Sequence, residues 1–175
     1  MLLYILQVVS IIFIGVKRMF DNVQINIPGG LDFKIPKMVK VKQNFEDHKI
    51  EDVALAVKNE MNKPEITNSI KAGASIAIGV GSRGVANIDI AVKSLVSCLK
   101  ELGAKPFIFP AMGSHGGGTV ENQKALLAGY GVTEEKVGAE VRATMETVVP
   151  AVLDDGTKVH MDKFAYEADG VVLIN

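Results

Sequence analysis

Two glycine-rich segments contain the residues whose types could do chemistry. The first spans residues 79–84, reads GVGSRG and contains Arg83. A guanidinium group on such a loop can hold a carboxylate through two parallel hydrogen bonds, although a solvated arginine or a structural ion pair would also explain it. The second spans residues 110–119, reads PAMGSHGGGT and contains His115, whose imidazole can exchange protons near neutral pH. A histidine that only caps or packs its loop is the alternative to an acid/base role.

The second segment also has the composition of an anion site. Gly116, Gly117 and Gly118 precede a predicted helix, so their backbone N–H groups can point at a bound anion. The segment lacks the Gly-Lys-Ser/Thr of a Walker A loop. Its order Gly-Ser-His-Gly also does not fit the G-x-S-x-G of a hydrolase nucleophile elbow. We interpret it as a single histidine on a glycine-rich loop that suits a negatively charged group.

The first segment fits the dinucleotide fingerprint G-x-G-x-x-G, after a strand and before a helix. Two features weaken this interpretation. The next helix is predicted only from Asn87, and the strand at residues 106–110 has no acidic residue at its end to hold ribose hydroxyls. Binding of an NAD-type nucleotide therefore stays an alternative.

Buried strands alternate with amphipathic helices along most of the chain. The main elements predicted are strands at 75–79, 106–110 and 170–174, helices at 87–102 and 119–130, and β-hairpins at 23–35 and 147–161. This order predicts an α/β fold with a Rossmann-like, mostly parallel sheet, helices on both faces and β-hairpin additions. In such sheets a ligand binds beyond the carboxyl ends of the strands, where both glycine-rich segments begin.

Shorter elements are expected between the main ones. They are a strand at 38–41, helices at 49–61 and at 64–72 (stopping at Gly73), a short helix after Thr133, and a helical turn at 162–167.

Composition excludes several classes of function. Of the 175 residues, 48% are hydrophobic and 22% are charged, which is typical of a globular domain rather than a disordered one. The net charge of -1 gives no support for nucleic-acid binding. The single cysteine, Cys98, fits a reducing compartment, so we expect a cytoplasmic protein. The three histidines are too far apart for metal-ligand spacing, and no metal site is predicted; we expect His48 and His160 to face solvent.

Residues 1–19 form an apolar N-terminal segment, and the domain is expected to span residues 20–175. The apolar run is shorter than the roughly 20 residues that cross a bilayer, and it lacks the charge order of a secretory signal. Three interpretations of this segment stay open: a translation start at Met19, a membrane-associated segment, and a packed helix. Membrane association is not the interpretation that we favour. The chain stops at Asn175, directly after the last predicted strand, so we expect a truncated domain.

Three segments together resemble the N-terminal domain of the lactate racemase-like family. They are residues 81–84 (GSRG), residues 110–117 (PAMGSHGG), and residues 166–170 (YEADG) followed by a strand that ends at Asn175. The resemblance covers residues 23–175. It implies a two-domain α/β racemase of 2-hydroxy acids that uses a nickel pincer nucleotide tethered to a lysine. It also implies a redox-neutral reaction in which hydride leaves and rejoins the α-carbon while one histidine on each face handles the hydroxyl proton.

The resemblance assigns roles to individual residues. His115 matches the first catalytic histidine, and Arg83, with Ser82 beside it, matches the group that holds the substrate anion. The glycine-rich segment would contact an anionic group of the substrate or cofactor through Gly113, Ser114, Gly116, Gly117 and Gly118. The second histidine, the lysine and the nickel ligand of the family lie beyond the position that matches Asn175, so a missing C-terminal domain or a partner chain is implied.

Three positions depart from the lactate racemases themselves. Val80 stands where they have an acidic residue, Gly84 where they have proline, and Gly116 where they have arginine. Because these positions belong to the expected pocket, lactate itself is not the only candidate, and a larger or differently charged 2-hydroxy acid is equally expected. The sequence therefore predicts the N-terminal catalytic fragment of a 2-hydroxyacid racemase or epimerase. The alternatives are the nucleotide-binding domain of an oxidoreductase and a non-catalytic binding domain.

Overall fold

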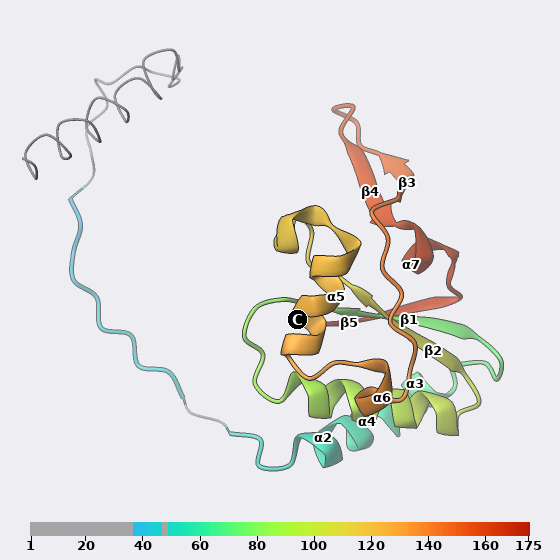
Figure 1. The fold of residues 1–175 in the computed structure, drawn as a ribbon. Helices are drawn as coiled ribbons and strands as arrows, with labels where there is room; N and C mark the ends of the chain where they lie inside the picture. The colour runs from blue at the N-terminus through green and yellow to red at the C-terminus, as the bar shows by residue number, and fades with distance from the viewer. Residues whose placement is uncertain (1–36, 47–48) are drawn as a thin grey trace, which may run out of the picture. The chain divides into compact units, whose positions relative to one another are not determined.

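A parallel sheet lies at the centre of the described part of the chain. The computed structural model describes residues 37–46 and 49–175. The chain divides into two units, Met1–Glu46 and Asp47–Asn175, and the sheet belongs to the second. Within the described residues the sheet has three strands in the order β2-β1-β5 (Figure 1); their bounds are Ser75–Val80 for β1, Lys105–Pro110 for β2 and Gly170–Ile174 for β5. Both pairings are parallel, which confirms the predicted mostly parallel sheet.

The strand side chains alternate between the two faces of the sheet. Ile78 and Ile108 lie on one face in the larger apolar cluster, whereas Ala77 and Phe107 lie on the other face in a smaller cluster. Strands that are covered on both faces need nearly continuous apolar runs, which is why β1 reads SIAIGV and β2 reads KPFIFP.

Helix α4 (Ile88–Glu101) covers the first face. Val92, Val96 and Leu99 recur every three or four residues and are buried against the sheet. The helix ends before Gly103, whose φ of +79° is a left-handed conformation that glycine adopts without steric cost. Helix α2 (Val53–Met61) packs against α4, so the described residues place two helical layers on this side.

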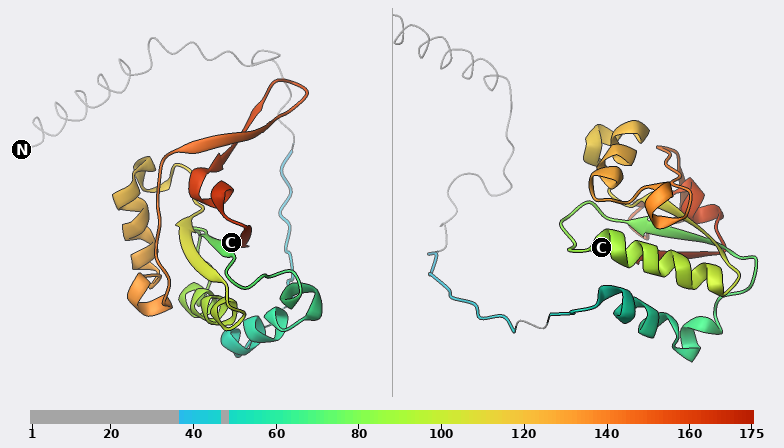
Figure 2. Two further views of the ribbon diagram at one scale, coloured as in Figure 1. Left: turned by 90° about the vertical axis from the view of Figure 1, so that its right-hand side faces the viewer. Right: turned by 60° about the horizontal axis from the view of Figure 1, so that its bottom comes forward.

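The second face is covered by α7 (Lys163–Glu167), which follows an antiparallel hairpin. The hairpin consists of β3 (Thr147–Val152) and β4 (Lys158–Asp162). Asp162 begins α7 by accepting a hydrogen bond from the backbone N–H of Ala165 at 3.0 Å, and Ala165 is buried against the sheet. Figure 2 shows α4 and α7 on opposite faces, so the predicted helices on both faces and the hairpin addition are confirmed.

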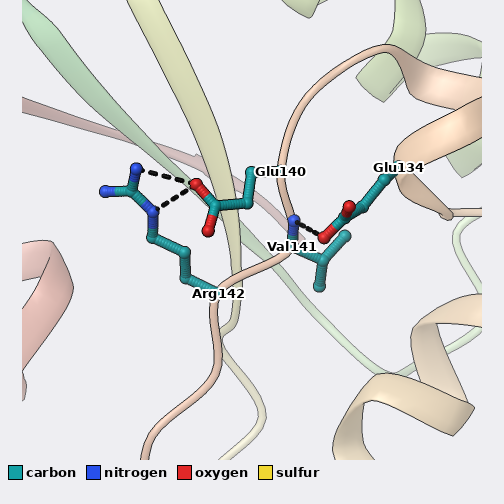
Figure 3. A network of polar contacts seen from close by, with 4 residues as sticks. All are labelled: Glu134, Glu140, Val141 and Arg142. Carbon is teal, nitrogen blue, oxygen red and sulfur yellow. Dashed lines mark hydrogen bonds and ion pairs between the residues drawn. The ribbon is translucent and has the colours of Figure 1, made fainter.

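The outer edge of β2 is covered by the segment that follows α5 (Val120–Gly129) and α6 (Glu134–Val137). The backbone N–H of Ile108 donates to the carbonyl of Glu140, and that of Arg142 donates to the carbonyl of Ile108, both at 2.8 Å. Figure 3 shows how side chains hold this segment: Glu134 accepts from the N–H of Val141, and Arg142 pairs with Glu140. An edge covered in this way is not open to pairing with another strand.

Strand β5 joins the other side of β1 through a two-way contact at its start. The backbone N–H of Asp169 donates to the carbonyl of Ser75 at 2.9 Å. In return, the Asp169 carboxylate accepts from the N–H of Ser75 at 2.8 Å, although the two residues are 94 positions apart. The start of β5 is therefore fixed in register against the start of β1.

Some predictions about the first half are wrong. The predicted strand at 38–41 has no regular structure and is exposed, with Met38 96% exposed. No strand among the described residues pairs with it, and a lone strand leaves its backbone groups to water. The helix predicted at 49–61 begins only at Val53, because Asp52 caps it, and the helix predicted at 64–72 is limited to α3 (Pro64–Thr67). The hairpin predicted at 23–35 and His48 lie outside the described residues.

Packing of α5 gives a direct test of the larger core. Leu127 of α5 is 0% exposed, whereas Leu55 of α2 is 53% exposed. Because truncation of a buried leucine leaves a cavity, Leu127→Ala should lower the free energy of unfolding by about 2–5 kcal/mol. The matched control Leu55→Ala, also in a helix, should change it by less than about 0.5–1 kcal/mol. Urea unfolding followed by circular dichroism measures both, and equal losses would contradict the core described above.

Candidate functional site

Parallel pairing brings the two glycine-rich segments together at one edge of the sheet. Val80 at the end of β1 is in register with Pro110 at the end of β2. The backbone N–H of Ala111 donates to the carbonyl of Val80 at 3.0 Å, so the two loops leave the sheet side by side. This is the carboxyl edge at which a ligand was expected.

A hydrogen bond joins the two loops through their most reactive side chains. Ser82 Oγ is hydrogen-bonded to His115 Nδ1, and both residues are partly buried. Ser82 thus contacts the imidazole directly, and its place beside a substrate anion stays a prediction. Because Nδ1 is engaged, Nε2 is the ring nitrogen left for another partner.

Two residues that the sequence did not single out hold these loops. Gln123 of α5 is only 3% exposed, and its Nε2 donates to the carbonyls of Gly113 at 2.8 Å and His115 at 3.2 Å. The hydroxyl of Tyr130 donates to the carbonyl of Ser82 at 2.7 Å. Gln123 lies four residues after Thr119, whose side chain caps α5. A polar residue one turn into a helix that follows a glycine-rich loop is the one sequence signal that could have indicated the role of Gln123.

The glycine-rich loop has the backbone that its composition suggests. Gly116, Gly117 and Gly118 have φ angles of +66°, +68° and +63°, which L residues with a side chain rarely adopt. At Gly116 a Cβ atom would also lie 3.1 Å from the backbone carbon of Asn122. The chain turns through these residues and enters α5 immediately afterwards. An anion at this helix start stays a prediction, as do the roles of Gly113 and the exposed Ser114.

Arg83 lies next to Ser82 and is exposed. Within the described ranges 37–46 and 49–175, its guanidinium makes no hydrogen bond or ion pair to the protein. An ion pair that would explain it structurally is therefore not seen among these residues. The side chain is available to hold a negatively charged ligand next to the loop that contains His115.

The helix after the first loop begins later than a dinucleotide fingerprint requires. Helix α4 starts at Ile88, and Asn87, at its N-terminus, has a left-handed φ of +55° and makes no side-chain capping hydrogen bond. Three residues, 85–87, thus separate Gly84 from the first helical residue. A pyrophosphate on the glycine loop would not rest on the helix terminus, in line with the late helix start predicted from the sequence, and NAD-type binding stays an alternative.

A hollow of about 560 Å³ lies beside the second loop, on the face of the sheet that carries α7. We call it the methionine hollow; the residues that define it here are Phe109, Met112, Gln123, Met145, Met161 and Leu173. A larger hollow of about 790 Å³ lies around Gly73 and Asp169 near the amino ends of the strands, far from the histidine loop. We favour the methionine hollow for function, because it adjoins the carboxyl edge.

The other predicted features can be placed as well. His160 is exposed, as expected, and shares a hydrogen bond of 2.9 Å with the hydroxyl of Thr147. Among the described residues no three His, Cys, Asp or Glu side chains form a group that could hold a metal. In the same part of the chain, no helix has the length and apolar character needed to cross a bilayer.

No protein-family model, curated protein or solved structure matches the chain. The family resemblance and the functions that it implies therefore stay predictions from the residues of this chain.

The carboxyl of Asp162, at the border of the hollow, should make the stability of the protein depend on pH. Burial raises its pKa above the ordinary value of 3.8, against the opposing hydrogen bonds from the N–H groups of Ala165 and Phe164. As pH rises, the unfolded chain releases this proton first, so the contribution of Asp162 to stability should fall between pH 3.8 and the raised pKa and be constant above it.

Replacement of Asp162 by asparagine, which also caps helices well, should remove this fall. The measurement is the difference in free energy of unfolding between wild type and Asp162→Asn from about pH 3.5 to about pH 7. Asp52→Asn, at the exposed N-cap of α2, is the control. In this variant the contribution of Asp162 to stability should still fall as pH rises. A difference that does not vary with pH would show that burial does not disfavour the Asp162 carboxylate.

Proposed function

We propose that the chain provides the proton-transfer and substrate-anchoring groups of a 2-hydroxyacid racemase or epimerase of the lactate type. The observation that supports this most directly is the hydrogen bond between Ser82 and His115, at the carboxyl edge where the two glycine-rich loops meet. It orients an imidazole on a loop whose neighbouring arginine is unpaired within the described residues. A base next to a free cation suits a substrate that carries a hydroxyl beside a carboxylate.

His115 acts as the general acid and base in this proposal. Its Nε2 takes the proton from the substrate hydroxyl, and an acceptor supplied by the C-terminal domain or partner chain would take the hydride from the α-carbon, which then becomes planar. Both are returned when the tetrahedral carbon is restored. For this the neutral ring must carry its own proton on Nδ1, and Ser82 Oγ is placed to accept a hydrogen bond from that N–H. Gln123 and Tyr130 act through the backbone, since they hold the carbonyls of His115 and Ser82.

Arg83 holds the substrate carboxylate. A guanidinium can grip a carboxylate in two parallel hydrogen bonds, which fixes the plane of the acid and thereby the direction of the adjacent hydroxyl. Val80, Gly84 and Gly116 stand where lactate racemases have larger or charged residues, so the proposal names 2-hydroxy acids as the class rather than lactate itself. We further propose that the protein works in the cytoplasm, in line with a single cysteine that is buried.

The nickel pincer nucleotide implied by the resemblance does not find its ligands here. The described residues contain no group of three His, Cys, Asp or Glu side chains for a metal, so these residues do not fit a complete site of their own. The lysine and the second histidine are likewise assigned by the resemblance to a C-terminal domain or a partner chain. The steps assigned to this chain above are therefore limited to what His115, Ser82 and Arg83 do.

Enantiomer-resolved kinetics test the two main assignments. The assay uses the chain joined to, or mixed with, the segment that supplies the second histidine and the lysine. His115→Gln should lower the rate from at least one enantiomer by about 10²–10⁴-fold, because proton transfer is lost. Arg83→Gln should raise KM by about 10–100-fold through loss of a charged hydrogen bond. Arg142→Gln, which removes the exposed pair with Glu140 and the contact of its guanidinium with the Phe107 ring, should not. Unchanged rates in both directions for His115→Gln would remove the basis of the proposal.

The protonation of the imidazole gives a second test that needs no activity. In the wild-type chain at alkaline pH, long-range ¹H–¹⁵N NMR should find the proton of neutral His115 on Nδ1. Ser82→Ala removes the acceptor and should shift the proton towards Nε2, whereas Ser82→Thr keeps a hydroxyl and should preserve the wild-type tautomer. A proton on Nε2 in the wild type would mean that Ser82 donates to Nδ1, and that His115 is not poised as the base.

A further inference from the structure

We propose that the methionine hollow binds a small apolar molecule that carries a hydrogen-bond donor. This inference does not depend on the proposed racemase activity, although the hollow adjoins the loop that contains His115. It rests on the walls of the hollow and on one polar atom at its border.

The walls suit an apolar ligand. The volume of about 560 Å³ falls within the range of small-molecule sites, roughly 300–1,000 Å³. Phe109 and Leu173 contribute side chains from the sheet, and Leu173 remains 67% exposed. Met112, Met145 and Met161 complete the walls, and their flexible thioethers can adapt to the shape of a bound ring.

Gln123 supplies the specificity. Its side-chain nitrogen faces the carbonyls of Gly113 and His115, so the amide oxygen Oε1 must point away from them. Within the described residues Oε1 has no hydrogen-bond partner, although the residue is 97% buried. No fully buried side-chain polar atom in the same residues lacks a partner, so Oε1 must reach open space, and Gln123 borders the hollow. Because the walls are mostly apolar, a buried and uncharged acceptor at their border favours a ligand with a donor.

The charged groups at the border disfavour an anion. Asp162 and Glu146 both border the hollow, and the carboxylate of Glu146 is paired with Lys163 at 2.5 Å. The negative charge of these two acidic side chains would repel a carboxylate ligand, whereas a neutral hydroxyl carries no charge for them to repel. The ligand class is thus distinct from the 2-hydroxy acid anion proposed for Arg83. Gln123 also donates to the His115 carbonyl. A ligand bound in the hollow would therefore contact the side chain that positions the loop containing His115.

A matched pair of probes tests the inference on the wild-type chain. p-Cresol and toluene have nearly the same ring and methyl group, but only p-cresol has a donor. With ¹³C-labelled methionine methyl groups, both should shift the signals of Met112, Met145 and Met161 and leave that of the exposed Met38 unchanged. p-Cresol should bind about 2–10-fold more tightly, as one net hydrogen bond allows. Equal affinities, or no shifts at these three methionines, would overturn the proposal.

Variants separate the acceptor from the walls. Gln123→Met should abolish the preference for p-cresol, and Leu173→Ser should weaken both probes by a similar factor. Leu153→Ser, at an exposed leucine outside the hollow, should change neither affinity. If Gln123→Met does not fold, the wild-type preference and Leu173→Ser still decide the question. None of these outcomes bears on the kinetics of His115→Gln, so failure of this site and failure of the racemase proposal can be told apart.

Discussion

Parallel pairing of β1 with β2 determines where the chemistry of this protein can take place. The six-residue register from Ser75 opposite Lys105 to Val80 opposite Pro110 places the ends of both strands at the same level. Two loops whose residues Ser82 and His115 are 33 positions apart in the chain therefore start next to each other. A slip of the register would separate the serine from the imidazole and turn the apolar faces of β2 towards the wrong layers.

The loops are precise because an adjacent helix holds them. The left-handed glycines of the histidine loop have little intrinsic order, since glycine loses more conformational freedom on folding than other residues. Gln123 compensates by holding two carbonyls of that loop from a buried position, and Tyr130 holds the other loop from the end of the same helix. Helix α5 is thus a support for the candidate site as well as part of the core, and the burial of Leu127 anchors that support.

The sequence predicted the sheet and its carboxyl edge because those depend on short-range patterns. An apolar run such as SIAIGV predicts a buried strand in an α/β domain. Arg83 and His115 are easily identified as candidate site residues because they lie on glycine-rich loops. The strand predicted at 38–41 fails because a β pattern specifies a strand only when a partner strand is at hand. Gln123 and the Ser82 contact with the imidazole were missed because they depend on how α5 and the two loops meet in three dimensions. The spacing of residues in the sequence does not predict how α5 and the two loops contact each other. A glutamine within a helix is also ordinarily a surface residue.

The contact between Ser75 and Asp169 has a consequence for how the chain folds. The β5 side of β1 cannot be completed until residues 94 positions further along the chain have been synthesised, whereas its β2 side is completed by the next strand in sequence. During synthesis at the ribosome, β1 and β2 can therefore pair while one edge of β1 is still open. Pairings of such high contact order form slowly, and an apolar edge that waits for its neighbour is exposed to association with other nascent chains. A chaperone that shields one strand edge would serve this protein during that interval, between the emergence of β1 and the arrival of β5.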